Sequence, residues 1–417
     1  MTIWKILLLA GTMLATCSSA WAGQAPGALS APDVPISHHD RVYAAEQFSN
    51  TLSVTDPVDN KLLGVIKLGD AQPANFSPLY KGQVLVHGLG YSPDHRTLAV
   101  VSIGSNSVTF IDTATNAVKH VTYVGRSPHE AFFTPDGREV WVTVRGENYI
   151  AVLDAKTFAE KTRIITPSGP GMQIFSPDGK YGYICSSFNP ETDVVSVADH
   201  KIIAKVKQES PFCPNIAATP DGHQVWFTLK DTGKTQVFNA RPPFNLIKTI
   251  DSGAITNHVN FAHTAKGTFA YVTIGGLNEV KVFRTDNFSE VATIPVGNLP
   301  HGVWPSGDGS RIYVGLENAD ALAARPVRER VSDSGRAREA ALNPPPLLDR
   351  PNEVRFDRID GLVEFVAIEA ETRFQPQRIP RAKPDRHDVR LSEQPARQRL
   401  GLCRGQRDFV SVLARIA

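Results

Sequence analysis

A tandemly repeated, strand-rich unit predicts an all-β fold, a β-propeller of four-stranded antiparallel blades, for residues 41–323. The repeat is marked by a Thr/Ser-Pro-Asp-Gly turn, whose prolines in four successive copies are spaced 42, 42 and 43 residues apart. Runs with alternating apolar residues flank the turns, and the apolar spacing typical of helices is absent. A solenoid of similar period would normally show a helix in each repeat.

The turn motif gives the phase of each repeat. Proline presets φ at the second turn position, and glycine accepts a positive φ without steric cost. Four close copies and then two degenerate ones follow on schedule, at 92–95, 134–137, 176–179, 219–222, 264–267 and 306–309.

Each turn is followed by strand patterns in a fixed order. The first run contains WVTV at 141–144 or YVTI at 271–274, and the next is of the type SVTFIDTATN at 107–116. A last strand such as EVATIPVG at 290–297 closes the unit. These motifs resemble the YVTN family of β-propeller repeats over residues 41–323. The resemblance implies a seven-bladed propeller related to WD-repeat-like and quinoprotein-like propellers, and implies little about chemistry.

Counting the blades also gives seven. Residues 41–69 provide only three strands, and the later blades begin near residues 87, 129, 171, 214, 258 and 301. In such propellers the C-terminus usually supplies the missing first strand. Residues 70–86 form a long connection between the first two blades, either an insertion or a cover for one channel end.

The C-terminal segment 324–417 departs from the repeat. It holds eighteen Arg and one Lys, whereas residues 1–323 hold nine Arg and sixteen Lys. We interpret it as a frameshift product or a disordered segment; a basic interaction arm and a genuine appended domain are the remaining alternatives. The sequence therefore predicts that ring closure is incomplete.

The N-terminus predicts export. Residues 1–22 read as a signal peptide with a lysine, a short apolar stretch and a small-residue cleavage site ending at Ala22; residues 23–40 then form a linker. Lipidation at Cys17 is the alternative. We expect a periplasmic or secreted protein without a transmembrane segment.

Composition narrows the function. The net charge of +2 gives no reason to expect nucleic acid as a partner, and we expect a monomer. No CxxCH motif occurs, which excludes covalent haem. The metalloprotease, serine-hydrolase and phosphate-loop motifs HExxH, GxSxG and GxxxxGK[ST] do not occur either.

Histidines recur in four blades at a position that opens the innermost strand, which in the second and third blades lies six residues before the turn proline. The fourth and fifth blades carry Gly171 and Pro214 there. Imidazoles at a channel end are able to bind a transition metal or accept protons, although such histidines also serve only the strand backbone. The four candidate metal ligands are His87, His129, His258 and His301.

Other polar residues are expected near the same end, as a ligand-binding set. Within it, Glu130 and Arg145 either pair with each other or orient an anionic ligand. The set is Glu130, Arg145, Asn215, Asn257 and Asn260. Cys185 and Cys213 fall near one end of neighbouring blades, so they form either a disulfide or two buried thiols.

Three functions remain open. The first is a module that binds a protein or small-molecule ligand without catalysis. The second is a metal- or quinone-dependent redox enzyme or accessory protein with a site at the channel histidines. The third, weaker, is a lactonase-like hydrolase.

Overall fold

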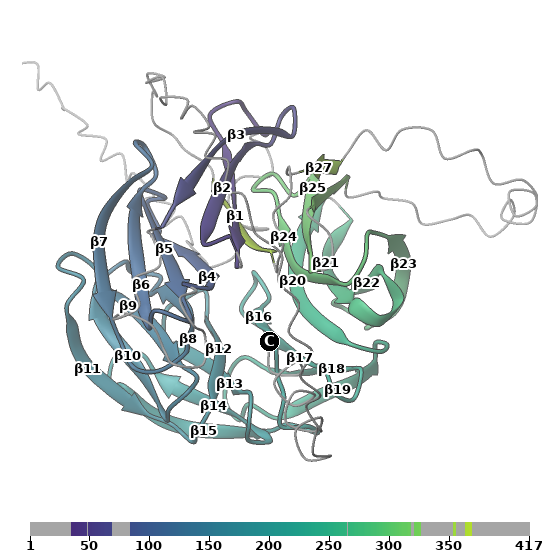
Figure 1. The fold of residues 1–417 in the computed structure, drawn as a ribbon. Coiled ribbons are helices and arrows are strands. Elements are labelled where there is room, and N and C mark those ends of the chain that lie inside the picture. Colours follow the sequence, from purple (N-terminus) through teal and green to yellow (C-terminus); the bar gives the residue numbers. More distant parts are fainter. Residues whose placement is uncertain are drawn as a thin grey trace, which may run out of the picture. The chain divides into compact units, whose positions relative to one another are not determined.

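Seven antiparallel sheets of four strands each are arranged around a common axis (Figure 1). The computed structural model describes residues 35–68 without 48, residues 84–317 without 265, and residues 321–326. It also describes the backbone of two strands, 353–355 and 363–368. The seven-bladed, four-stranded architecture predicted from the sequence is confirmed. The expected signal peptide, most of the long connection and the rest of the tail lie outside the described residues.

The innermost strand of each blade is buried along its whole length wherever its side chains are described, apart from the ends of two strands in the fifth and sixth blades. Apart from β28, which was not predicted, these strands begin within two residues of the positions that the repeat predicts. In blade order they are β28 (Val363–Ile368), β4 (Val86–Tyr91), β8 (Pro128–Phe133), β12 (Pro170–Phe175), β16 (Ile216–Ala218), β20 (Thr256–Thr264) and β24 (Pro300–Pro305).

The second strands carry the Val-Thr motif and the large aromatic residues of the core. Trp141 is fully buried and its ring meets Phe175 of the next blade, with centroids 5.0 Å apart; Trp226 meets Phe261 in the same way at 5.8 Å. These aromatics therefore pack blade against blade. The strands are β1 (Arg41–Glu46), β5 (Thr97–Ser102), β9 (Glu139–Val144), β13 (Tyr181–Ser186), β17 (Gln224–Leu229), β21 (Gly267–Ile274) and β25 (Arg311–Leu316).

The third strands are again largely buried. A short 3-10 helix, η2 (Gly275–Leu277), precedes one of them. They are β2 (Thr51–Asp56), β6 (Ser107–Asp112), β10 (Tyr149–Asp154), β14 (Glu191–Ser196), β18 (Lys234–Asn239), β22 (Glu279–Arg284) and β26 (Ala321–Pro326).

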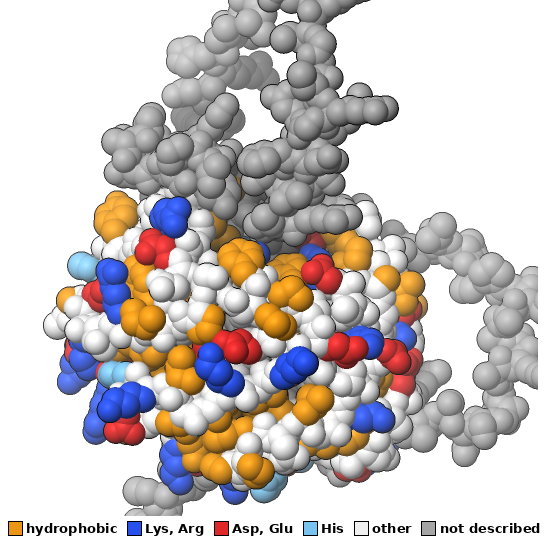
Figure 2. Space-filling model, turned by 90° about the horizontal axis from the view of Figure 1, so that it is seen from below, with side chains coloured by type: hydrophobic (Ala, Val, Ile, Leu, Met, Phe, Trp, Pro, Cys, Tyr) orange, Lys and Arg blue, Asp and Glu red, His pale blue; other side chains and the backbone are white. Residues whose placement is uncertain are grey.

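The outermost strands whose side chains are described face solvent on one side, and on the face drawn in Figure 2 blue and red side chains are interspersed. No helix in the described part of the chain is long and apolar enough to cross a membrane. The strands are β3 (Lys61–Lys67), β7 (Ala117–Tyr123), β11 (Glu160–Ile165), β15 (Lys201–Lys207), β19 (Leu246–Asp251), β23 (Glu290–Pro295) and β27 (Glu353–Arg355).

The turn motifs are built as their residues predict. In the third blade Gly137 has φ +68°, and the Thr134 hydroxyl donates a 2.6 Å hydrogen bond to Asp136 Oδ1. A side chain at Gly137 would meet Pro93 of the preceding turn, so neighbouring turns also contact each other.

Ring closure differs from the expectation. Strand β28 pairs with β1 from Arg41↔Ile368 to Glu46↔Val363 and supplies the strand that the first blade lacks. The seventh blade also continues past residue 323, through β26 to β27. The prediction of incomplete closure relied on the side-chain motifs of the repeat. Pairing with an open strand edge, however, needs only main-chain groups in a short extended segment.

Candidate functional site

The four predicted histidines lie near the starts of β4, β8, β20 and β24, at one end of the sheets, which we call the histidine end. All four are buried, with exposed fractions of 4–7%. The ring centroids of His87 and His129 are 4.3 Å apart, and those of His258 and His301 are 4.4 Å apart. Across the first blade, His87 and His301 are separated by 6.5 Å. The imidazoles thus form a continuous row of two close pairs.

An irregularity of each inner strand positions these side chains. The strand register shifts between Val86 and Leu89 in β4 and between Pro128 and Ala131 in β8. Corresponding shifts occur in β20 and β24 at the histidine positions. A bulge breaks the alternation of side chains between the two faces of a strand, which allows consecutive residues to approach the same site.

The threonine of the Val-Thr motif holds these irregular segments in place. Thr143 Oγ1 accepts a 2.9 Å hydrogen bond from the Glu130 amide and donates one of 2.9 Å to the Gly171 carbonyl of the next blade. Thr273 Oγ1 likewise accepts a bond from the His258 amide. This role of the threonine was not predicted from the sequence, although the Val-Thr motif that signals it is visible there.

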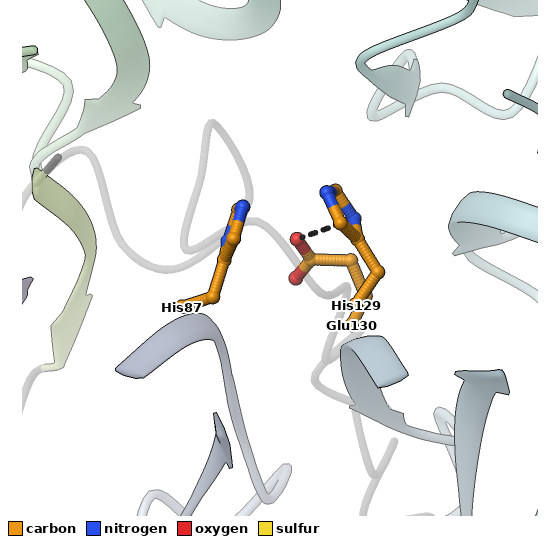
Figure 3. Close-up of side chains that lie close together, drawn as sticks. All are labelled: His87, His129 and Glu130. Atoms are coloured by element: carbon orange, nitrogen blue, oxygen red, sulfur yellow. Dashed lines mark ion pairs between the residues drawn. The ribbon is translucent and has the colours of Figure 1, made fainter. Parts of the chain in front are cut away.

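Glu130 joins the first histidine pair. Its Oε1 lies 3.5 Å from His129 Nδ1, and one ligand atom from each of His87, His129 and Glu130 lies within 4.8 Å of the others (Figure 3). The carboxylate is buried and reaches this position beside Gly88, where a Cβ would collide with it. Two nitrogen or oxygen ligands of one tetrahedral zinc ion are about 3.4 Å apart, so this group fits a small divalent ion.

The imidazoles of His129 and His301 are held neutral. Burial lowers the pKa of His129 well below 6.5, and the nearby His87 and Arg145 act in the same direction. Burial also lowers the pKa of His301, as do His258 and Lys230. His301 Nδ1 is buried and has no hydrogen-bond partner among the described residues. A neutral imidazole with an available lone pair is the form that binds metal.

The remaining predicted ligand residues have other contacts. The Arg145 guanidinium carbon lies 5.8 and 5.7 Å from the ring centroids of Phe188 and Phe212. The three asparagines connect blades. Asn215 Oδ1 accepts a 2.9 Å bond from Val259 N, Asn257 Nδ2 donates one of 2.7 Å to Pro300 O, and Asn260 Nδ2 donates one of 3.4 Å to Val303 O.

Cys185 and Cys213 form a disulfide that joins the fourth and fifth blades close to the histidine end. Both residues are fully buried. The bridge connects the end of β13 to the segment before β16, in two of the blades that lack a histidine at the repeat position.

The fold and site define a seven-bladed β-propeller with buried histidines gathered at one end of its axis. A solved structure titled hydrazine synthase, from Kuenenia stuttgartiensis, is 19% identical with a TM-score of 0.58, and the match covers 70% of this chain and 96% of that one. A functionally unknown protein from Desulfotomaculum acetoxidans is 15% identical with a TM-score of 0.58, covering 69% and 92%. Such low identities show the fold alone. No protein-family model and no curated protein matches the sequence.

Proposed function

We propose that this chain is an exported β-propeller that binds a divalent transition-metal ion at its histidine end. The observation that carries the proposal is the buried group of His87, His129 and Glu130. Two imidazoles and one carboxylate form a ligand set typical of zinc sites that keep a fourth position open. The proposed role is binding, which the sequence favoured. The proposed ligand is a transition metal, which the sequence analysis considered under the alternative of a metal-dependent protein.

The spacing of the rings favours one ion at each pair over one ion shared by four histidines. A nitrogen bound at zinc distance places its ring centroid about 3.2 Å from the ion, so two opposite rings are at most about 6.4 Å apart. His87 and His301 already lie 6.5 Å apart, whereas the rings within each pair are closer than 4.5 Å. The pair with Glu130 has the fuller ligand set and is the proposed primary site.

The test begins with protein stripped by a chelator and titrated with Zn²⁺ or with Co²⁺, whose visible absorption reports coordination by nitrogen and oxygen. We expect stoichiometric binding to the wild type. The substitutions His87→Ala with His129→Ala should abolish it, and Glu130→Gln should weaken it at least about tenfold because the negative ligand is lost.

His223→Ala is the matched control, since His223 is exposed and follows the turn at the opposite end. It should leave binding unchanged. The melting temperature of the double variant should fall relative to the wild type only in metal-containing buffer. An equal fall with and without metal, together with unchanged Zn²⁺ affinity, would mean that these histidines serve the fold alone.

Two further parts of the proposal rest on sequence. The N-terminal pattern favours export, and the disulfide between Cys185 and Cys213 is the type of bond that persists in oxidising compartments. Relationship to the YVTN repeats is supported by the threonine of the motif, because in three blades it bonds to the carbonyl of the next blade's inner segment.

A further inference from the structure

Three consecutive blades place hydrogen-bond donors at one repeat position of the histidine end. This position directly follows the second strand: Arg145 follows β9, Ser187 follows β13 and Lys230 follows β17. The pairing register between the first and second strands shows that the ends of these second strands pair with the starts of the inner strands, as Val144 does with Pro128. The donors therefore belong to the same end as the histidines but span the third to fifth blades.

In the fourth and fifth blades the inner strands carry Gly171 and Pro214 at the position where the second, third, sixth and seventh blades carry histidine. A Cβ at residue 171 would collide with the Ser187 hydroxyl, so the hydroxyl occupies the space that a side chain would take. Ser187 and Lys230 thus belong to the two blades that carry Gly171 and Pro214, whereas Arg145 belongs to the blade of His129.

Both cations are half-buried. The Arg145 guanidinium lies over the rings of Phe188 and Phe212, which belong to the fourth blade and to the segment before the fifth. Lys230 has no ion pair among the described residues, and its charge reaches His301 two blades away. The adjacent Asp231 is exposed, and Glu130 Oε1 lies 3.5 Å from His129 Nδ1.

We propose that Arg145, Ser187 and Lys230 form a binding site for a small oxyanion at the histidine end. Guanidinium and ammonium groups are the preferred partners of carboxylate and phosphoryl oxygens, and a hydroxyl adds a neutral donor. The partial burial of both cations strengthens the attraction relative to a fully exposed site. This site is independent of bound metal, so metal-free protein is expected to contain it.

The test uses the full chain after chelator treatment, titrated calorimetrically with inorganic phosphate, sulfate and succinate in separate experiments. We expect one site for at least one anion. Arg145→Gln and Lys230→Gln should each weaken it about tenfold or more, which is the effect of losing one charge-assisted hydrogen bond. Preference for phosphate and sulfate would assign a tetrahedral anion, and preference for succinate a carboxylate.

Lys156→Gln is the matched control, because it removes one exposed positive charge from the turn after β10, at the opposite end. It should leave the affinity unchanged. A measurement without variants is the protection of Lys230 from acetic anhydride by the bound anion, read by mass spectrometry. Absence of binding by all three anions, or equal weakening by Lys156→Gln, would overturn the proposal whether or not the protein binds Zn²⁺.

Discussion

Thr273 Oγ1 donates a 2.6 Å hydrogen bond to the carbonyl oxygen of His301 in the next blade. The same hydroxyl oxygen accepts a 2.8 Å bond from the amide of His258. One buried side chain thus sets the positions of both histidines of the second pair, and the seam between the sixth and seventh blades depends on it.

Replacing Thr273 by valine keeps the shape and removes both bonds. We expect the free energy of unfolding to fall by about 1–3 kcal/mol, because buried backbone groups lose their partner. Urea denaturation measures this. Thr122→Val, which removes a 2.7 Å bond to the Phe158 carbonyl near the outer strands, is the control and should cost less. A larger loss in the control would contradict the role assigned to Thr273.

Glu46 should make the stability fall as pH rises. Burial raises its pKa from 4.5 to about 7, although Thr51 and Ser53 donate hydrogen bonds to the carboxylate. Between these two values the folded state binds more protons than the unfolded state, so the free energy of unfolding decreases with increasing pH. The change is on the order of 1–3 kcal/mol.

Glu46→Gln should remove this decrease, so that the free energy of unfolding of the variant rises relative to that of the wild type from pH 4.5 to pH 7. The measurement is urea denaturation across that range. Glu160→Gln, at a partly exposed carboxyl group on an outer strand, should leave the pH dependence as it is. A wild type and Glu46→Gln with parallel pH profiles would show that the carboxyl group titrates normally.

The disulfide should contribute substantially to stability. It closes a loop with a sequence separation of 28 residues, for which the loss of unfolded-state entropy is worth about 3.6 kcal/mol. Cys185→Ser combined with Cys213→Ser should lower the stability by about this amount in non-reducing buffer. Reductant should destabilise the wild type toward the variant and leave the variant unchanged; sensitivity of both proteins to reductant would place the effect elsewhere.

Two truncations test closure of the ring. Ending the chain after residue 375 keeps β28, whereas ending it after residue 360 removes β28 and exposes the edge of β1. Because an unpaired edge promotes association between molecules, we expect the shorter protein to melt earlier and to aggregate in light-scattering measurements. Equal stability of the two proteins would favour the incomplete closure that the sequence predicted. An insertion or deletion found near codon 323 by resequencing the gene would favour it as well.

Export predicts a defined mature N-terminus. N-terminal sequencing of the protein secreted by an expressing cell should begin at Gly23, because the small residues before it form the cleavage site. Recovery of a lipidated Cys17 would contradict cleavage after Ala22 and would indicate a membrane-anchored form.

The sequence by itself determined the blade number, the phase of each blade and the candidate histidines, because these depend on a local period. Glycine and proline determine the turns, and alternating apolar residues mark the strands between the turns. His87 and His301 could therefore be assigned to equivalent positions although more than two hundred residues separate them. The blade order also predicts the two adjacent pairs, whereas the distances between the rings could not be predicted in the same way.

Only the tertiary structure decided how the blades meet. The 6.5 Å between His87 and His301 depends on the geometry of the whole ring, and the approach of Glu130 to His129 depends on a bulge that breaks simple alternation. The proposed role of Lys230 in anion binding could be inferred only from its position relative to other blades. The pairing of β28 with β1 joins segments over three hundred residues apart through main-chain groups, which leave no side-chain signature in the sequence.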